Sequence, residues 1–514
     1  MYAYKMFNKS SKKIILNFEP FHTIPNSTKF LFFIKEASGI VEKDQLSLKL
    51  MVHKETNKVL FAEVGKDFVD VLISFLTLPL GTIDRLVAKQ SDMGPIRIAS
   101  VSSLYESVEE LYDDYMLTDS CMVMLLHPKN PMEDYCRSLK LNVDDTDPTN
   151  YYVCNNLLQC QNGGSVMCST FKSKKCSCGK LLGNQIFLKG YDSFEGFVKE
   201  NSCFLVTDDL CILPMSLDTM VSIIKKMGIE DISTLKEIEV GVTKNKLIDL
   251  LKCSLVSKTP LTDVFLHKKP CLQKSDGNIV YLSSDFIHEQ CTSVDVKIMY
   301  QKSDGKILCA QGNDFANFLL SFLTFPLGVV VRLLQGNSSM GSIDGLYKSV
   351  ADLNEDLFNT KEVKVKLVDL GLPPQFKLSN QVLPISEVRA PIYHCVTKSS
   401  NPKLSDFFLT EDPIIVDPSK KCMDVIMVDP ISVNESSKVF LRGPTVFAAT
   451  DDLLVSPISF IPLLSLSNNS NTNLGDIDVK LVNIGLYEGL SILKASLTSS
   501  SALTNGLAHL VIVF

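Results

Sequence analysis

Five cysteines lie close together in the first half of this chain and are its clearest candidates for chemistry. They are Cys154, Cys160, Cys168, Cys176 and Cys178. A structural zinc ion takes four thiolate or imidazole ligands in a tetrahedron, so five thiols offer a sufficient set. The commonest ligand pair is Cys-x2-Cys, whereas five, seven, seven and one residues separate these cysteines. Two interpretations are open for these residues: a structural zinc site, or a loop of free cysteines.

Paired carboxylates are the second candidate, at Asp208-Asp209 and Asp451-Asp452. Adjacent residues on a strand point to opposite faces, so a pair shares a proton or a metal ion only in a turn. An Asp in a tight turn also bonds its own backbone without any further function. We favour this interpretation over catalysis, and it predicts that Asp208→Asn affects stability alone.

The remaining polar residues form no complete catalytic motif. Arg85 and Arg332 recur behind a Pro-Leu-Gly turn, where each either binds a carboxylate or covers a helix surface. The Gly-x-Ser-x-Gly and His-Glu-x-x-His motifs are absent, and no histidine recurs at an equivalent place in both halves. An enzyme would need a site assembled between the halves, from Asp208, Asp209 or Cys178 together with His394.

The elements that position these residues belong to an internal repeat. Seven of eight residues in the run 74–81 return in the run 321–328, and shorter matches follow at 104–108 with 346–350 and at 204–210 with 447–453. Tyr393-His394-Cys395 aligns with Tyr152-Val153-Cys154, and Lys421-Cys422 aligns with Lys175-Cys176. Since no further cysteine lies between residues 395 and 422, we expect zinc in the first copy only.

Hydrophobic periodicity predicts the same elements in both copies. Alternating runs over 46–52 and 58–64, and over 294–300 and 306–310, indicate β-hairpins. The spacing of Phe68, Val71, Leu72, Phe75 and Leu76 is that of a helix with one buried face, and residues 315–323 repeat it. Proline ends each of these helices, and a second amphipathic stretch follows. We expect the preceding acids, Asp67 and Asp314, to be the helix N-caps. Further strands are predicted at 236–242 and 480–486, with helices at 246–255 and 489–497.

These patterns predict an α+β fold of two tandem homologous units. Each unit has antiparallel β-hairpins packed on amphipathic helices, and the first unit adds a small Cys-rich loop subdomain. The expected boundaries are an N-terminal extension at 1–45, a first unit at 46–267 with a Cys-rich insertion at 150–182, a linker at 268–292 and a second unit at 293–514.

Composition indicates a well-packed globular protein. The 514 residues are 45% hydrophobic and 21% charged, with a net charge of -7. An acidic chain argues against nucleic acid as the main partner, since phosphate binding needs clustered Lys and Arg. The longest apolar stretch is too short to span a membrane and contains Pro326. Most of the 15 cysteines are scattered singly through apolar segments, so we expect a reducing compartment, the cytoplasm or the nucleus, without organellar import.

The chain resembles a known family of plant proteins, the family of the domain of unknown function 674. The residues that carry the resemblance are the runs 61–70, 74–81, 207–210 and 250–255. The resemblance covers both copies and implies a plant origin. It implies no catalytic residues, because the family name assigns no activity.

Three functions are consistent with this sequence. The favoured one is a non-enzymatic binding or scaffold protein for a protein partner or a small molecule, with a structural zinc site in the first copy. The residues common to both copies are apolar, turn-forming or capping, which is what a fold requires. The alternatives are the enzyme described above and a zinc-ribbon nucleic-acid-binding protein that uses Lys172, Lys174 and Lys175.

Overall fold

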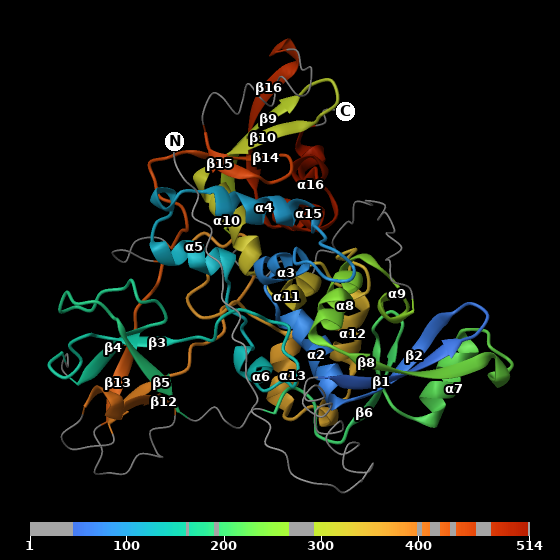
Figure 1. The fold of residues 1–514 in the computed structure, drawn as a ribbon. Helices are drawn as coiled ribbons and strands as arrows, with labels where there is room; N and C mark the ends of the chain where they lie inside the picture. Colours follow the sequence, from blue (N-terminus) through green and yellow to red (C-terminus); the bar gives the residue numbers. More distant parts are fainter. Residues whose placement is uncertain are drawn as a thin grey trace, which may run out of the picture. The chain divides into compact units, whose positions relative to one another are not determined.

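The computed structural model describes residues 45–160, 164–189, 195–266, 292–397, 403–411, 422–431, 438–458 and 474–511 (Figure 1). The predicted N-terminal extension and linker fall outside these residues, apart from Gln45 and Thr292. We call 45–266 the first half and 292–511 the second half. The fold is α+β, with helices and largely antiparallel sheets.

Each half contains a five-stranded antiparallel sheet, and the two sheets have the same strand order. The order is β7-β6-β2-β1-β8 in the first half and β15-β14-β10-β9-β16 in the second. The strands of the first sheet are β1 (Leu46–His53), β2 (Lys58–Gly65), β6 (Cys203–Thr207), β7 (Ile212–Pro214) and β8 (Leu235–Val242). Those of the second are β9 (Val294–Gln301), β10 (Ile307–Gln311), β14 (Phe447–Thr450), β15 (Val455–Pro457) and β16 (Ile477–Ile484). All four predicted hairpin strands are present.

Helices connect and cover the strands in both halves. Those of the first half are α2 (Lys66–Thr77), α3 (Leu80–Val87), α4 (Ala99–Glu110), α5 (Asp119–Leu126), α6 (Glu133–Arg137), α7 (Leu217–Lys226), α8 (Lys244–Val256) and α9 (Pro260–Phe265). Those of the second are α10 (Asn313–Ser321), α11 (Leu327–Leu333), α12 (Ile343–Asp352), α13 (Lys361–Val368), α15 (Leu486–Thr498) and α16 (Ala502–Val511). Short 3-10 helices occupy Asp113–Tyr115, Ile232–Thr234, Phe322–Thr324, Glu355–Leu357, Leu404–Asp406 and Leu474–Asp476. No helix among the described residues is long and apolar enough to cross a bilayer.

The N-cap prediction for α2 and α10 is wrong. Gly65 and Gly312 are the N-cap residues, and neither helix has a side-chain cap. Asp67 and Asp314 lie inside the first turn instead. A carboxylate there is still favourable, because it lies near the positive end of the helix dipole.

The repeated Pro-Leu-Gly runs contact one another. Pro79 and Pro326 form an antiparallel bridge, with hydrogen bonds of 2.9 Å from the Leu80 amide to the Phe325 carbonyl and from the Leu327 amide to the Leu78 carbonyl. A Cβ added at Gly81 would lie 3.1 Å from the Leu323 carbonyl oxygen, and one at Gly328 would lie 3.1 Å from that of Leu76. Each glycine therefore permits the backbone of the other half to approach closely.

A six-stranded barrel is the element that the sequence did not predict. Its closed order is β11-β12-β5-β3-β4-β13, so each half contributes three consecutive strands. The halves meet along two parallel pairs, β12 with β5 and β13 with β4. Figure 1 shows these strands apart from the five-stranded sheets. The barrel strands are β3 (Tyr151–Val153), β4 (Ser165–Ser169), β5 (Asn184–Leu188), β11 (His394–Thr397), β12 (Phe407–Thr410) and β13 (Cys422–Met427).

Candidate metal centre

Three loop segments beside the barrel bring four of the five predicted cysteines together. Cys154 follows β3, Cys160 lies in the β3–β4 connection, and Cys176 and Cys178 lie in the β4–β5 connection. Their four sulfur atoms all lie within 4.8 Å of one another. The Sγ atoms of Cys154 and Cys178 are 3.5 Å apart, and those of Cys160 and Cys176 are 3.3 Å apart.

Short backbone hydrogen bonds position these residues. The Cys160 amide donates to the Asn156 carbonyl at 2.8 Å, which folds the loop after β3 back on itself. The Cys176 amide donates to the Lys180 carbonyl at 2.8 Å, and Lys175 pairs with Leu181, so residues 174–182 form a small hairpin. Gly179 has φ of +82°, a conformation that glycine adopts without strain, and it closes the tip of this hairpin after Cys178.

The centre has a buried side and an exposed side. Cys154 and Cys176 are buried and pack with Leu182 into a small apolar cluster. Cys160 is partly buried, and Cys178 is exposed. Solvent therefore reaches the group through Cys178, while the opposite side is held by the barrel wall.

The donor set fits a tetrahedral metal ion. Four thiolates at the Zn–S distance of about 2.3 Å place neighbouring sulfurs about 3.8 Å apart. The sulfur separations bracket this value, and they are far longer than the roughly 2.05 Å of a disulfide. An all-sulfur set is typical of closed structural zinc sites, which leave no ligand position open to substrate.

Neighbouring thiols and backbone donors shift the pKa values of this group. The hydrogen bond with Cys176 and burial raise the pKa of the Cys160 thiol. Burial raises the pKa of Cys154. A hydrogen bond from the Lys180 amide lowers the pKa of Cys178 to about 7. The Cys178 thiol therefore ionises more readily than those of Cys154 and Cys160.

Cys168 does not join this group. It lies on β4 with its side chain fully buried in the barrel core, where it packs with Val153, Ile186 and Cys395. Cys168 pairs with Val153 across β4 and β3, and Leu409 pairs with Cys395 across β12 and β11. The second half therefore has a leucine at the position that Cys168 occupies in the first. Burial in this apolar core raises the pKa of Cys168 to about 12, as expected for an inert thiol.

The described part of the second half has no matching cysteine group, and the alignment that we expected there is shifted. Val153 and Cys395 occupy the barrel core on β3 and β11, so Tyr151 corresponds to Tyr393. Cys422 begins β13, which occupies the position of β5 rather than that of the hairpin at 174–182. His394 faces Asp424 at 3.3 Å.

The other polar candidates hold loops in place. Asp208 is buried and accepts hydrogen bonds from the Thr262 amide at 2.8 Å and hydroxyl at 2.6 Å, at the start of α9. Asp451 accepts a bond of 2.7 Å from the Thr504 amide at the start of α16. The structure therefore does not bring Asp208 together with Cys178 or His394, since each has its own neighbours in a different element.

Arg85 and Arg332 each pair with an aspartate, although the two aspartates are not at equivalent positions of the halves. Arg85 pairs with Asp145, and Arg332 pairs with Asp369 at 2.9 Å. Arg85 thus joins α3 to the loop after α6, and Arg332 joins α11 to the end of α13. The terminal nitrogens make these ion pairs, while the Nε atom of each arginine is buried without a hydrogen-bond partner among the described residues.

Comparison with known proteins identifies a family and no individual relative. No curated protein matches the chain, and no solved structure matches it. A family model described as "Protein of unknown function (DUF674)" matches residues 42–487, which is most of the chain and includes both sheets and the barrel. The chain therefore belongs to this family, as the repeated runs of its sequence indicate.

Proposed function

We propose that this chain is a non-enzymatic binding protein built from two homologous copies of one unit, with a structural zinc ion in the first. The observation that carries the zinc site is the convergence of four sulfurs from three loop segments to within 4.8 Å. Cys154, Cys160, Cys176 and Cys178 are the proposed ligands. Because the set is complete without water or substrate, the ion would stabilise structure rather than catalyse a reaction.

The surroundings support a bound cation with four thiolates. A zinc ion with four thiolates carries a net charge of about -2, which is costly near an apolar wall unless positive charge lies nearby. Lys172, Lys174, Lys175 and Lys180 surround the cysteines in sequence. Lys172 lies over the Tyr152 ring, 5.2 Å from its centroid, on a strand next to Cys154. A charge-balancing role for Lys172 would need no nucleic acid.

The two-copy architecture is supported by the corresponding contacts of the halves. The sheets share one strand order, and the barrel takes three strands from each half. Ser100 donates to the Ser499 carbonyl at 2.6 Å, and Ser342 donates to the Ser257 carbonyl at 2.8 Å, which are reciprocal contacts between the halves. The polar residues common to both copies serve these contacts and the loop anchors, which favours a binding role over catalysis.

The zinc proposal is tested by metal analysis of the purified full-length protein. We expect about one zinc ion per chain, and cobalt substitution should give the absorption of a tetrahedral thiolate complex. Replacing Cys160 or Cys176 with Ser should remove most of the metal. Cys168→Ser is the matched control, because this cysteine is as close in sequence yet lies in the barrel core. A metal-free protein that also fails to bind added zinc would refute the proposal, as would equal metal loss in the Cys168 variant.

A further inference from the structure

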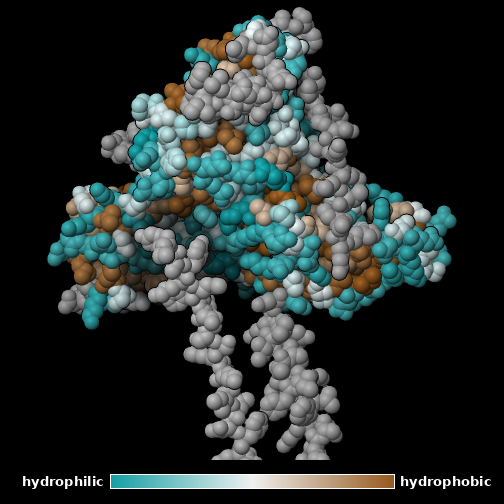
Figure 2. Space-filling view, turned by 45° about the horizontal axis from the view of Figure 1, so that its top comes forward, coloured by the Kyte–Doolittle hydropathy of each residue, from teal (hydrophilic) through white to brown (hydrophobic). Residues whose placement is uncertain are grey.

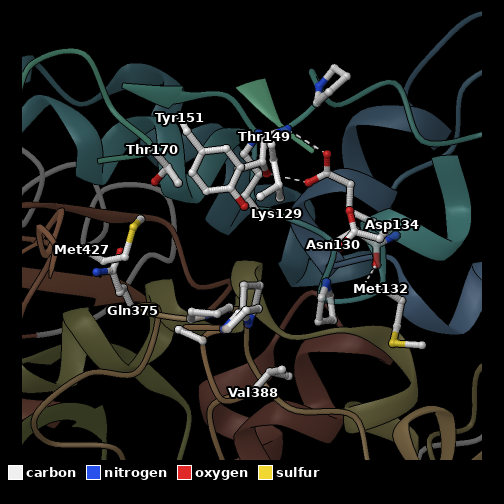
Figure 3. A pocket seen from close by; sticks show the side chains of 18 of the residues that line it. Lys129, Asn130, Met132, Asp134, Thr149, Tyr151, Thr170, Gln375, Val388 and Met427 are labelled. Carbon is white, nitrogen blue, oxygen red and sulfur yellow. Dashed lines mark hydrogen bonds between the residues drawn. The ribbon is translucent and has the colours of Figure 1, made fainter. Parts of the chain in front are cut away.

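A cavity of about 460 Å³ lies where loops of both halves meet the barrel (Figure 3). Its wall includes residues 129–135 and 148–151 from the first half and residues 373–376 and 388–391 from the second. This volume is within the range of small-molecule sites. In Figure 3, Tyr151 and Asp134 of the first half face Val388 and Gln375 of the second across this space.

Two tyrosines at corresponding positions of the halves supply hydrogen-bonding groups. The hydroxyl oxygens of Tyr151 and Tyr393 are 2.9 Å apart, and their rings meet edge to face with centroids 5.3 Å apart. The two hydroxyls carry two protons, but their mutual hydrogen bond uses only one. Among the described residues the second proton has no recorded acceptor. The tyrosine pair can therefore donate a hydrogen bond to a ligand.

Asp134 is the carboxylate in this wall that lacks a hydrogen-bond partner among the described residues. Its nearest cation is the Arg137 guanidinium, at 3.7 Å, which is too far for a hydrogen bond. Arg137 instead binds Glu133 at 2.8 Å, and Glu133 also accepts hydrogen bonds from the amide and hydroxyl of Thr149. Asp369, another carboxylate of the wall, is neutralised by Arg332.

The positive side chains of the wall are largely engaged elsewhere. Lys129 donates to the Asp147 carbonyl at 2.7 Å. The Lys366 ammonium lies over the Tyr135 ring, 5.7 Å from its centroid. Arg389 is exposed and has no recorded ion pair among the described residues. Asp134 is thus a carboxylate of the wall without a hydrogen-bonded cation among the described residues.

The pKa values of the acidic groups in the wall show how burial and neighbouring charges act on them. Burial, followed by the charge of Glu133, raises the pKa of Asp134 to about 6. Burial also raises the pKa of Tyr151, Tyr393 and Glu411, and the Asp134 charge contributes to all three shifts. The Asp134 contribution to the other three shifts is Coulombic, and the same negative charge would attract a cation placed among these groups.

We propose that this cavity binds a small organic cation, a protonated amine on a flat and mainly apolar body that carries a hydrogen-bond acceptor. Asp134 pairs with the ammonium group, and the Tyr151–Tyr393 pair donates to the acceptor. Tyr135, Phe376, Pro373, Pro374 and Met427 supply ring and aliphatic surface for the body. The inference names a ligand class for the binding role proposed above, and it does not depend on the zinc site.

Three arylalkyl probes that differ in charge test the inference on the full-length, metal-analysed protein. They are tyramine as the cation, 4-ethylphenol as the neutral analogue and 3-(4-hydroxyphenyl)propionate as the anion, each titrated by calorimetry and by ligand-observed NMR. We expect tyramine to bind best. Asp134→Asn should weaken tyramine binding about tenfold or more, with little effect on 4-ethylphenol, because only the ion pair is lost.

Asp369→Asn is the matched control, since that carboxylate lines the same cavity but is already paired; it should leave tyramine binding unchanged. Preference for the anion, equal binding of the three probes or no binding of any probe would overturn the inference. So would tyramine binding that survives Asp134→Asn. Because the metal content of the same sample is known, a failure of ligand binding in zinc-loaded protein leaves the zinc proposal standing and is thereby distinguished from it.

Discussion

Asp84 is a single buried carboxylate that makes the stability of the first half depend on pH. It lies on α3 and is 5% exposed, with one hydrogen bond from the Ser102 hydroxyl. Burial raises its pKa to about 6, Ser102 and Arg97 lower it, and the charges of Glu106 and Glu109 raise it further. In the repeated run the corresponding residue is Val331, which is fully buried. The second half therefore has an apolar side chain where the first has an ionisable one.

We predict that this carboxylate destabilises the fold as the pH rises. The folded pKa of about 6 exceeds the unfolded value of 3.8, so the folded state binds more protons between these values. The favourable contribution is full below pH 3.8 and is lost as the pH rises through 6. Relative to the wild type, Asp84→Asn should gain up to about 3 kcal/mol of unfolding free energy between pH 4 and pH 7. Urea unfolding at both pH values measures the difference, and Asp92→Asn, at an exposed position, is the control. Identical pH dependence in the wild type and in Asp84→Asn would contradict the prediction.

Asp208 is a second residue-scale case: it lies in a turn, as expected, but its carboxylate holds the start of a distant helix and not its own backbone. Its carboxylate satisfies two donors of Thr262, and burial raises its pKa to about 6. Replacement by Ala would leave a buried amide without its acceptor. We expect Asp208→Ala to lower the unfolding free energy by about 1–3 kcal/mol. Asp209→Ala, which leaves the Thr262 donors satisfied, should cost less. Urea unfolding of the two variants measures the difference. Equal losses of unfolding free energy would show that the hydrogen bonds to Thr262 do not explain the effect of Asp208→Ala.

At the level of elements, the Pro-Leu-Gly turns join the halves. Glycine to alanine inside a helix usually stabilises by up to about 1 kcal/mol. At Gly81, which is in α3, the new Cβ would lie 2.9 Å from the Leu125 carbonyl oxygen and 3.1 Å from that of Leu323. We therefore predict the opposite sign, a loss of about 1–3 kcal/mol on Gly81→Ala. Gly65→Ala is the control, because no atom lies within 4 Å of its added Cβ. Thermal unfolding compares the variants, and a stabilised Gly81→Ala would disprove close packing there.

The elements also show how far sequence reasoning reaches. The hairpins, the helices α2 and α10 and the helices α8 and α15 follow from hydrophobic periodicity, because each buries one face in a regular pattern. The barrel was missed because its strands are short, and β3 and β11 have only three and four residues. Their alignment was also shifted by one residue, which exchanges the inner and outer faces of a strand. That shift matched Cys154 to Cys395, whereas the first lies in the metal centre and the second in the barrel core.

The candidate metal ligands could be predicted only as a set. Nothing in their spacing separates Cys168 from the other four, since all five lie in one segment with irregular intervals. The distinguishing signal is the alternation within β4, where Val166 and Cys168 point into the core. Leu409, at the corresponding position of the second half, is apolar, which also indicates that this position lies in the core. The cavity gave no signal, because its wall comes from segments that are distant in the sequence.

At the level of the whole molecule, the barrel and the main core each depend on both halves. The main hydrophobic cluster includes Leu76 and Leu323, and the barrel closes only when β12 meets β5 and β13 meets β4. The surface seen in Figure 2 is largely hydrophilic, with separate hydrophobic areas, as for an ordinary folded unit. Each half alone would expose a large part of this interior.

We predict that the halves associate when they are expressed as two chains. Fragments 45–266 and 292–511, produced together with a tag on the first, should co-purify in equal amounts because the core and barrel contacts do not require a continuous backbone. Produced alone, either fragment should aggregate or unfold at a lower temperature. Independent folding of both fragments, without association, would contradict this expectation.

The paired tyrosines have one more consequence. In the proposed two-copy architecture, Tyr151 and Tyr393 would lie at a pseudo-twofold axis, and in a symmetric dimer of one unit every wall residue around such an axis would occur twice. In this chain, the repeat spacing from α5 to α13 matches Glu133 with Gln375 and Asp134 with Phe376. One side of the axis is therefore acidic and the other is amide and aromatic. A ligand that binds here therefore has one preferred orientation instead of two equivalent ones.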